Sequence, residues 1–300
     1  MKKTKYACLL ALWVLFSCNT SNKIDDIPNT PTSGKLKVYC ENGLFLQIRN
    51  QIYTFEQIYV NTKVDVNYVN EKQAIVGLYN DSCEVIVMSR ALSADEIKYF
   101  NAKNINPTQI CVAKSALAFV VANNSADTII SMDKIKRILS GEEASYNMVF
   151  DDENSSTTHF LKDSLLQGKA FGKNCFAQKS TAELISYISK NKNTIGVLDY
   201  AWLSDKNDSI SKVFLQSVKI LAVNSNVNKT AYMPDQSNIK TGDYPLCRWV
   251  YTIRRSTGFT LGTGFSLFIA GRKGQIMFIK QGLIPFIQPD RPIEVIKKSL

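Results

Sequence analysis

The chain has 300 residues, of which 45% are hydrophobic and 21% are charged, so it is long and apolar enough for two lobes with separate cores. Its formal net charge is +10, and the basic residues are scattered as single lysines or short pairs, without the interleaved Arg and aromatic residues that stack on bases. This composition argues against disorder beyond the first stretch and against a nucleic-acid partner, and it supports only a general preference for anionic ligands or surfaces.

The first residues have the pattern of a secretion signal. Three lysines precede an apolar run, residues 7–16, that is too short to span a bilayer as a permanent helix. The run ends in Leu15-Phe16-Ser17-Cys18, which resembles the bacterial lipobox, where cleavage before the cysteine leaves it as a lipidated N-terminus. We therefore predict a lipoprotein signal peptide over residues 1–17 and a lipid anchor, of the palmitate type, on Cys18. Simple secretion is the alternative.

Residues 18–34 are polar, contain two prolines and are predicted to form a flexible tether. Five cysteines remain beyond Cys18, and their odd number and wide spacing argue against a disulfide framework and against a zinc site, although one pair could form a bridge.

Strands and helices alternate in the next part of the chain. Strands are predicted at residues 35–40, at 64–68 from alternation and at 85–88 from a continuous apolar run, each followed by a helical pattern, and this order implies a mostly parallel sheet. Because such sheets bind ligands at the carboxyl ends of their strands, the loops at residues 41–43 and 89–90 are candidate site loops. Arg90 could grip an oxyanion with two hydrogen bonds, or it could be a surface residue paired with Asp95 or Glu96.

A long apolar run at residues 109–122 predicts a strand that leaves one lobe and enters the next. A helix is predicted over residues 131–140, ended by Gly141, and a strand at residues 194–198. Run lengths place hinges near residues 112–115 and 217–222.

Residues 149–166 predict a loop that leads into a helix. Asn154 is followed by four consecutive hydroxyl residues, and Phe160, Leu161 and Leu165 then recur at helical spacing. Ser155 or Ser156 would be the N-cap, and hydroxyls beside the free N–H groups of a helix start suit a small oxyanion. An ordinary capped surface helix is the alternative.

The order of these motifs resembles the phosphate-binding members of the type II periplasmic-binding-protein family, which serve bacterial phosphate ABC transporters. The resemblance rests on the secretion signal, Ser-Arg-x-Leu at residues 89–92 before a capped helix, the crossing strand, the Ser-rich helix start and TIGVLDYAWL at residues 194–203. Tyr244-Pro245-Leu246 and the segments at 274–275 and 282–285 are similar to the closing segments of that family, so the match spans about residues 35–290.

This resemblance implies an α/β fold of two lobes, each a mixed, mostly parallel sheet flanked by helices, with the ligand cleft between them. Lobe 1 would comprise residues 35–112 and 220–300, and lobe 2 residues 113–219. The protein would capture inorganic phosphate and deliver it to ABC permease subunits, as a monomer without a cofactor. It would be held by its N-terminal lipid in the cell envelope, on the periplasmic or surface side of a bacterial membrane.

The resemblance also implies site residues. The Gly-Ser-Gly-Thr loop of the family corresponds to Asn154-Ser155-Ser156-Thr157, which makes these hydroxyls candidates. The loop that follows the fourth strand of the family corresponds to Ser89 and Arg90. The predicted phosphate-binding residues are Ser155, Thr157, Ser156, Ser89, Arg90, Asn42 and Gly43.

Two departures from the family pattern affect this assignment. Glu41-Asn42-Gly43 stands where the family usually has Thr or Ser, and a carboxylate close to a phosphate dianion is repulsive unless one of them carries a proton. Glu41 would therefore turn away or accept the proton of the ligand. Asp151-Asp152-Glu153 stands where the family often has Arg, which leaves Arg90 as the main positive charge assigned to the site.

An enzyme is not predicted. Hydrolysis would need His159 as the base for Ser155 or Ser156 with Asp163 as its orienter, but His159 falls in the first helical turn and the chain lacks a Gly-x-Ser-x-Gly motif. A single histidine and the lack of Cys-x-x-Cys also argue against a metal site. The competing hypothesis is a lipid-anchored binding or interaction module of the same fold, with another anionic or glycan ligand and no transport role.

Overall fold

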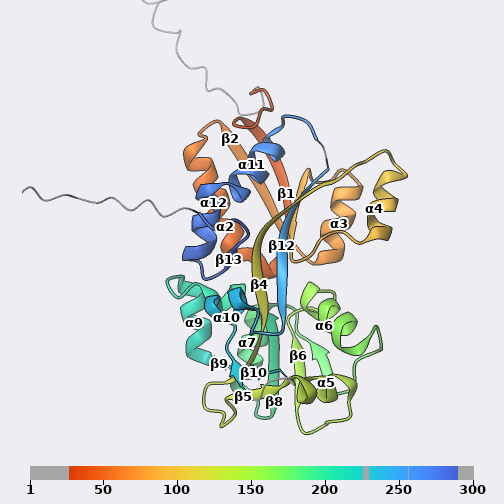
Figure 1. The fold of residues 1–300 in the computed structure, drawn as a ribbon, viewed down its shortest axis with the longest axis vertical. Coiled ribbons are helices and arrows are strands. Elements are labelled where there is room, and N and C mark those ends of the chain that lie inside the picture. Colours follow the sequence, from red (N-terminus) through yellow and green to blue (C-terminus); the bar gives the residue numbers. More distant parts are fainter. Residues whose placement is uncertain (1–26, 226–229, 256, 290–300) are drawn as a thin grey trace, which may run out of the picture.

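The computed structural model describes residues 27–225, 230–255 and 257–289, which form two α/β lobes stacked along the long axis of the molecule (Figure 1). The predicted signal peptide and Cys18 lie outside the described residues. Lobe 1 is built from both ends of the described chain and lobe 2 from its middle.

Lobe 1 contains a sheet with the strand order β2-β1-β3-β12-β4, in which β1 pairs in parallel with β2 and β3, and β12 runs antiparallel to β3 and β4. Its strands are β1 (Gly34–Glu41), β2 (Thr62–Val69), β3 (Val85–Met88), β12 (Cys247–Arg254) and the first part of β4 (Thr108–Ala122). Its helices are η3 (Asn42–Leu44), α2 (Phe45–Ile58), α3 (Glu71–Tyr79), α4 (Ala94–Asn101), α11 (Leu261–Ala270) and α12 (Arg272–Lys280), followed by the short strand β13 (Ile284–Pro285). The three strands predicted before residue 90 are confirmed.

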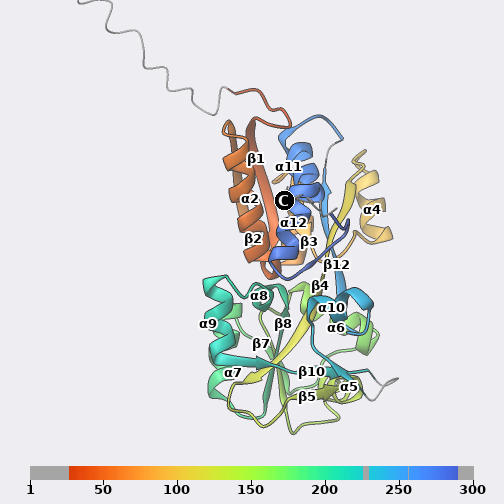
Figure 2. The same cartoon turned by 60° about the vertical axis from the view of Figure 1, so that its left-hand side comes forward.

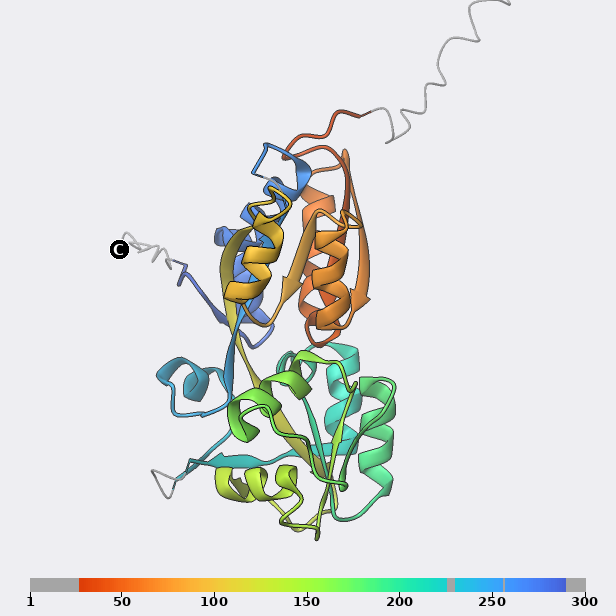
Figure 3. The same cartoon turned by 90° about the vertical axis from the view of Figure 1, so that its right-hand side faces the viewer.

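Both faces of the lobe 1 sheet are covered at its centre, which explains why β3 is apolar without a break, whereas β1 and β2 alternate buried and exposed residues. Val85 and Val87 pack with α2, α11 and α12 on one face, whereas Ile86 and Met88 pack with α3 and α4 on the other. Figures 2 and 3 show these two helical layers on opposite sides of the sheet. A parallel sheet buried on both faces is the arrangement that a continuous apolar strand predicts.

Lobe 2 has one hydrophobic core, with strands β8, β6 and β7 pairing in parallel and β4 antiparallel to β8. The main-sheet strands are β6 (Asn147–Phe150), β7 (Cys175–Ala177), β8 (Thr194–Asp199) and β9 (Val218–Ile220), and a smaller sheet contains β5 (Ile129–Ser131), β10 (Ala222–Asn224) and β11 (Ala231–Tyr232). The helices are α5 (Met132–Ser140), α6 (Ser156–Leu166), α7 (Thr181–Lys190), α8 (Ala201–Ser204), α9 (Ser209–Ser217) and α10 (Gln236–Thr241).

Two antiparallel neighbours, β4 and β12, connect the lobes (Figure 1). Residues 108–116 of β4 pair with β12, and residues 117–120 pair with β8, so the predicted crossing strand is confirmed. The pairing of β12 with β4 is shifted by a bulge between Val250 and Tyr251. Residues 217–222, predicted as a hinge, instead lie within lobe 2, because β9 pairs there with the end of β4.

The hydrophobic cores divide the chain differently from the prediction at one boundary. Val223, Ile239 and Tyr244 are buried in the core of lobe 2, although residues 220–300 were assigned to lobe 1. We therefore propose that lobe 2 extends to about Leu246 and that β12 is the return to lobe 1.

The C-terminal part of the predicted tether is packed against lobe 1. Residues Thr30 and Ser33 form a bridge, and the Oδ1 atom of Asn29 accepts a hydrogen bond of 2.8 Å from the N–H of Leu261, the first residue of α11. A Cβ atom on Gly264 would meet the carbonyl oxygen of Pro31 at 1.7 Å, so the segment lies directly on this helix. The prediction of a flexible tether over 18–34 is therefore wrong for residues 27–34.

We expect Asn29→Ala to lower the free energy of unfolding by about 1 kcal/mol, because it removes the acceptor for an N–H group that has no partner within its own helix. Chemical denaturation of the two proteins measures the change. Asn124→Ala, an exposed residue, is the control and should change stability by less than about 0.5 kcal/mol. An equal effect of both substitutions would show that the contact of Asn29 contributes nothing.

Candidate functional site

The carboxyl ends of strands from both lobes meet where the lobes face each other. Glu41 ends β1 and Ser89 follows β3 in lobe 1, while Asp151 follows β6 and Asp199 ends β8 in lobe 2. Polar side chains therefore gather at the carboxyl ends of the parallel strands, where open α/β sheets bind their ligands.

The start of α6 has the geometry predicted from residues 149–166. Ser155 is the N-cap, with an extended backbone (φ −72°, ψ 154°), and its Oγ accepts a hydrogen bond from the N–H of Thr158. Ser155, Ser156 and Thr157 are all buried at the lobe interface. The first N–H groups of a helix have no acceptor within the helix, so this end presents donors and a partial positive charge to the cleft.

The carboxylate of Glu41 joins the lobes. Its Oε2 accepts a hydrogen bond of 2.8 Å from the backbone N–H of Ser89, and its Oε1 accepts one from the hydroxyl of Ser156 at the start of α6. Glu41 is 3% exposed, so it has not turned away from the site. Burial raises the pKa of Glu41 to about 7, opposed by the positive charge of Arg248 and reinforced by Asp199 and Glu71.

Arg248 is the buried cation beside this carboxylate, and it is not among the residues predicted from the sequence. Its Nη1 donates to the Oγ of Ser156 at 2.6 Å and its Nη2 to the Oδ2 of Asp199 at 2.5 Å. Asp199 also accepts from the hydroxyl of Ser115 at 2.6 Å. Strand alternation was the available signal, because it places Arg248 on the same face as the buried residues Val250 and Thr252.

Arg90 lies close by but is held by carboxylates of its own lobe. Its Nη2 contacts Glu71 at 2.7 Å and its Nη1 contacts Glu96 at 2.8 Å, and its side chain is 36% exposed. The pairing with Glu96 agrees with the alternative interpretation of Arg90. The guanidinium is therefore largely engaged, and Arg248 is the better candidate for the cation of the site.

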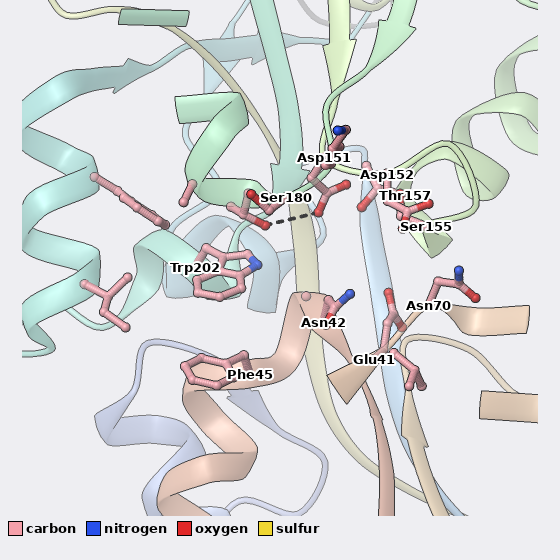
Figure 4. A pocket seen from close by; sticks show the side chains of 17 residues that line it. Glu41, Asn42, Phe45, Asn70, Asp151, Asp152, Ser155, Thr157, Ser180 and Trp202 are labelled. Carbon is pink, nitrogen blue, oxygen red and sulfur yellow. Dashed lines mark hydrogen bonds between the residues drawn. The ribbon is translucent and has the colours of Figure 1, made fainter. Parts of the chain in front are cut away.

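A cavity of about 460 Å³ opens between the lobes next to Glu41 (Figure 4). Four predicted residues line it, Asn42, Gly43, Ser155 and Thr157. The other three, Ser89, Arg90 and Ser156, line a neighbouring hollow of about 390 Å³ together with Arg248 and His159. Both hollows include residues of the Glu41–Ser156 bridge, so the seven predicted residues surround one region.

The acidic stretch before α6 also reaches the cavity. Asp151 is 5% exposed, and burial raises its pKa to about 6. Its Oδ2 accepts from the hydroxyl of Thr181 at 3.4 Å, whereas its Oδ1 has no hydrogen-bond partner among the described residues. Asp152 lines the cavity too, and its Oδ1 accepts from the N–H of Asn154.

The geometry does not assemble a serine hydrolase. The Nδ1 atom of His159 faces the carboxylate of Glu71 in lobe 1 at 3.4 Å, and Ser156 donates to Glu41. Within residues 27–225, 230–255 and 257–289, no three His, Cys, Asp or Glu side chains are grouped to hold a metal ion. The five cysteines of this part of the chain are unpaired, with Cys40 and Cys83 buried as small core residues. Among the described helices, none combines the length and hydropathy needed to cross a membrane.

Two α/β lobes, two crossing strands and a cleft lined by helix starts are the architecture of a two-lobed binding-protein fold. A family model described as "PBP superfamily domain" matches residues 28–273. The chain therefore belongs to the PBP superfamily, and its fold is the type II arrangement expected from the sequence. Membership in a family of binding proteins agrees with the prediction that the chain is not an enzyme.

Curated relatives and solved structures place the chain near phosphate-binding proteins. It is 25% identical to the phosphate-binding protein PstS of Borreliella burgdorferi over 251 residues, which covers 78% of this chain and 83% of the relative. It is 22% identical to PstS of Pseudomonas aeruginosa over 274 residues, covering 82% and 80%.

Among solved structures, one from Clostridium perfringens is described as a phosphate ABC transporter substrate-binding protein with bound phosphate. Its TM-score to this chain is 0.71 at 16% identity, and the match covers 85% of this chain and 100% of that structure. An ABC-type phosphate transport receptor from Vibrio cholerae has a TM-score of 0.64 at 15% identity, covering 84% and 100%. At these identities the structures establish the shared fold.

Proposed function

We propose that this protein is an extracytoplasmic solute-binding lipoprotein that captures inorganic phosphate between its lobes and delivers it to an ABC permease. The observation that carries the proposal is the convergence of donors on the carboxylate of Glu41: the N–H of Ser89 from lobe 1 and the hydroxyl of Ser156 from lobe 2, with Arg248 behind them. A carboxylate is itself an oxyanion, so donors that hold it can also hold a phosphate oxygen.

Phosphate would take the place that the Glu41 carboxylate occupies. Ser89, Ser156 and Arg248 would contact it through a backbone N–H group, a hydroxyl and the guanidinium. Ser155 and Thr157, from the same helix start, would face it from the adjoining cavity. Glu41 would then bind protonated or move aside, because two adjacent negative charges in a buried site repel each other.

In mechanism the protein would act as a hinged clamp. Donors for the oxyanion come from both lobes, so a bound ligand favours the closed arrangement, and the closed form docks on the permease. The named relatives support this role, since two are phosphate-binding proteins and one solved structure contains phosphate. The lipid on Cys18, the monomeric state and the envelope location belong to the proposal as well.

The acids around the cavity favour a second candidate function. Glu41, Asp151 and Asp152 line it together with a single basic residue, Lys179. A lipid-anchored binding module of the same fold, with another anionic or glycan ligand and no transport role, fits this lining.

Calorimetric titration with phosphate tests the proposal, with sulfate as the parallel anion and after unfolding and refolding to remove carried-over ligand. We expect a dissociation constant that is micromolar or tighter, weakened at least about tenfold in Ser156→Ala, which removes a donor of the site. Ser186→Ala, an exposed hydroxyl on α7, is the matched control and should bind as the unmodified protein does. If neither anion produces heat, the second candidate function replaces the first.

A further inference from the structure

We propose that the site also binds phosphate monoesters of hydroxylated organic compounds, such as polyols or sugars, and binds them more tightly than inorganic phosphate. This inference rests on the proposed function, because it keeps the phosphoryl group at the donors around Glu41. It assigns the remaining cavity to the organic portion of the ligand.

The cavity is larger than a bare oxyanion needs. Its volume of about 460 Å³ lies within the range of roughly 300–1,000 Å³ found for sites that bind drug-sized molecules. One water takes about 30 Å³ of liquid volume, so a five-atom ion would leave most of this space to solvent. Glu41 lines this cavity, whereas Ser156, which donates to it, lines the neighbouring hollow, so the oxyanion donors lie at the boundary between the two.

One wall of the cavity is aromatic and apolar. Phe45 at the start of α2 and Trp202 in α8 stack with ring centroids 5.5 Å apart and an interplanar angle of 14°, and Phe214 lies against Trp202 at 5.9 Å. Figure 4 shows Phe45 and Trp202 on the side of the cavity opposite Ser155, Thr157 and Glu41. Aromatic rings bind the apolar faces of organic groups, whereas a hydrated inorganic ion gains nothing from them.

The polar wall offers an acceptor that needs a donor. Asp151 is 5% exposed, and its side chain points into the cavity. Its Oδ1 is enclosed and has no hydrogen-bond partner among the described residues. The Oδ2 atom accepts one long hydrogen bond, of 3.4 Å from Thr181, so this carboxylate can still accept a hydrogen bond from a ligand hydroxyl. The nearby carboxylates of Asp152 and Glu41 would repel a second anionic group on the ligand. The organic portion should therefore carry hydroxyls and no carboxylate.

The test compares four probes by calorimetry on the purified protein: inorganic phosphate, glucose 6-phosphate, glucose and 3-phosphoglycerate. We expect glucose 6-phosphate to bind at least about tenfold more tightly than phosphate, and 3-phosphoglycerate to bind more weakly than glucose 6-phosphate, because its carboxylate meets the acids. Trp202→Leu should weaken the ester about tenfold and leave inorganic phosphate within about twofold. Asp151→Asn should weaken the ester as well.

Trp249→Leu is the matched control, because Trp249 is 42% exposed on β12 and does not line the cavity. Thermal unfolding of each variant shows that it is folded. The inference is overturned if the ester binds no more tightly than inorganic phosphate, or if Trp202→Leu weakens the binding of both ligands equally. The proposed function would stand in either case. Tight ester binding without any binding of inorganic phosphate would support the inference and contradict phosphate transport. If none of the phosphorylated probes binds, both fail.

Discussion

Arg248→Ala is expected to abolish phosphate binding and to lower the free energy of unfolding by about 3–5 kcal/mol. The side chains of Arg248 and Asp199 are 3% and 1% exposed, so removal of the guanidinium leaves a carboxylate buried without its counter-charge. The same substitution removes the donor behind Ser156 at the centre of the proposed site. Urea denaturation measures the first effect and calorimetric titration the second.

Two controls separate the structural role of Arg248 from its role in binding. Arg137→Ala breaks a surface pair with Glu143 and should cost at most about 1 kcal/mol. The double variant Arg248→Met with Asp199→Leu removes both charges of the buried pair and should recover most of the stability, yet it should still not bind phosphate. Recovery of binding together with stability would show that Arg248 acts only through the fold.

Arg90→Ala decides between the two candidate cations. Because Glu71 and Glu96 already engage its guanidinium, we expect phosphate affinity to fall less than about tenfold. Loss of binding in this variant but not in Arg248→Ala would support the assignment made from the sequence.

Glu41 should make both stability and ligand binding depend on pH. Burial raises the pKa of Glu41 from 4.5 to about 7 in the folded chain. Between these two pH values the folded state holds a proton that the unfolded state has released. The corresponding stability is present below about pH 4.5 and is lost as the pH rises to about 7, by about 3 kcal/mol in total. Glu41→Gln should remove this part of the pH dependence, leaving a change of similar size at lower pH from Asp151, whose pKa is raised from 3.8 to about 6.

The same proton should control the oxyanion site. At pH 8 the ionised Glu41 competes with the ligand for Ser89 and Ser156, whereas at pH 5.5 it is protonated and can donate. We expect anion affinity to rise about tenfold or more as the pH falls from 8 to 5.5 in the unmodified protein, and to change less than about threefold in Glu41→Gln. Sulfate is the informative second anion, because its own charge is constant over this range. An unchanged pH profile in Glu41→Gln would exclude Glu41 as the titrating group.

Local signals were sufficient to predict the helix start that forms the lobe 2 side of the site. Ser155 caps α6 because a short polar side chain followed by helical apolar spacing needs no distant partner. The first three strands of lobe 1 were also predictable, because β3, buried on both faces, is an unbroken apolar run and β1 and β2 alternate apolar and polar residues. The crossing strand followed from its length alone.

Contacts between distant residues could not be predicted in the same way. Arg248 is 92 residues from Ser156 and 49 from Asp199, and only the antiparallel placement of β12 beside β4 brings them together. Arg90 was assigned to the ligand because the competing carboxylate of Glu71 lies on another helix. The boundary that we propose near Leu246 had no clear signal in the sequence, because β9, β10 and α10 are too short to carry a periodic pattern.

The bulge between Val250 and Tyr251 gives the β4–β12 connection a point of compliance. A bulge interrupts the ladder and bends the strand, and this interruption falls on the connecting strands close to Arg248. A rotation about this point displaces groups near the axis by little and the outer ends of the lobes by much more. In the proposed clamp, a small displacement at the Arg248 guanidinium would therefore correspond to a larger displacement at the outer surfaces of the lobes.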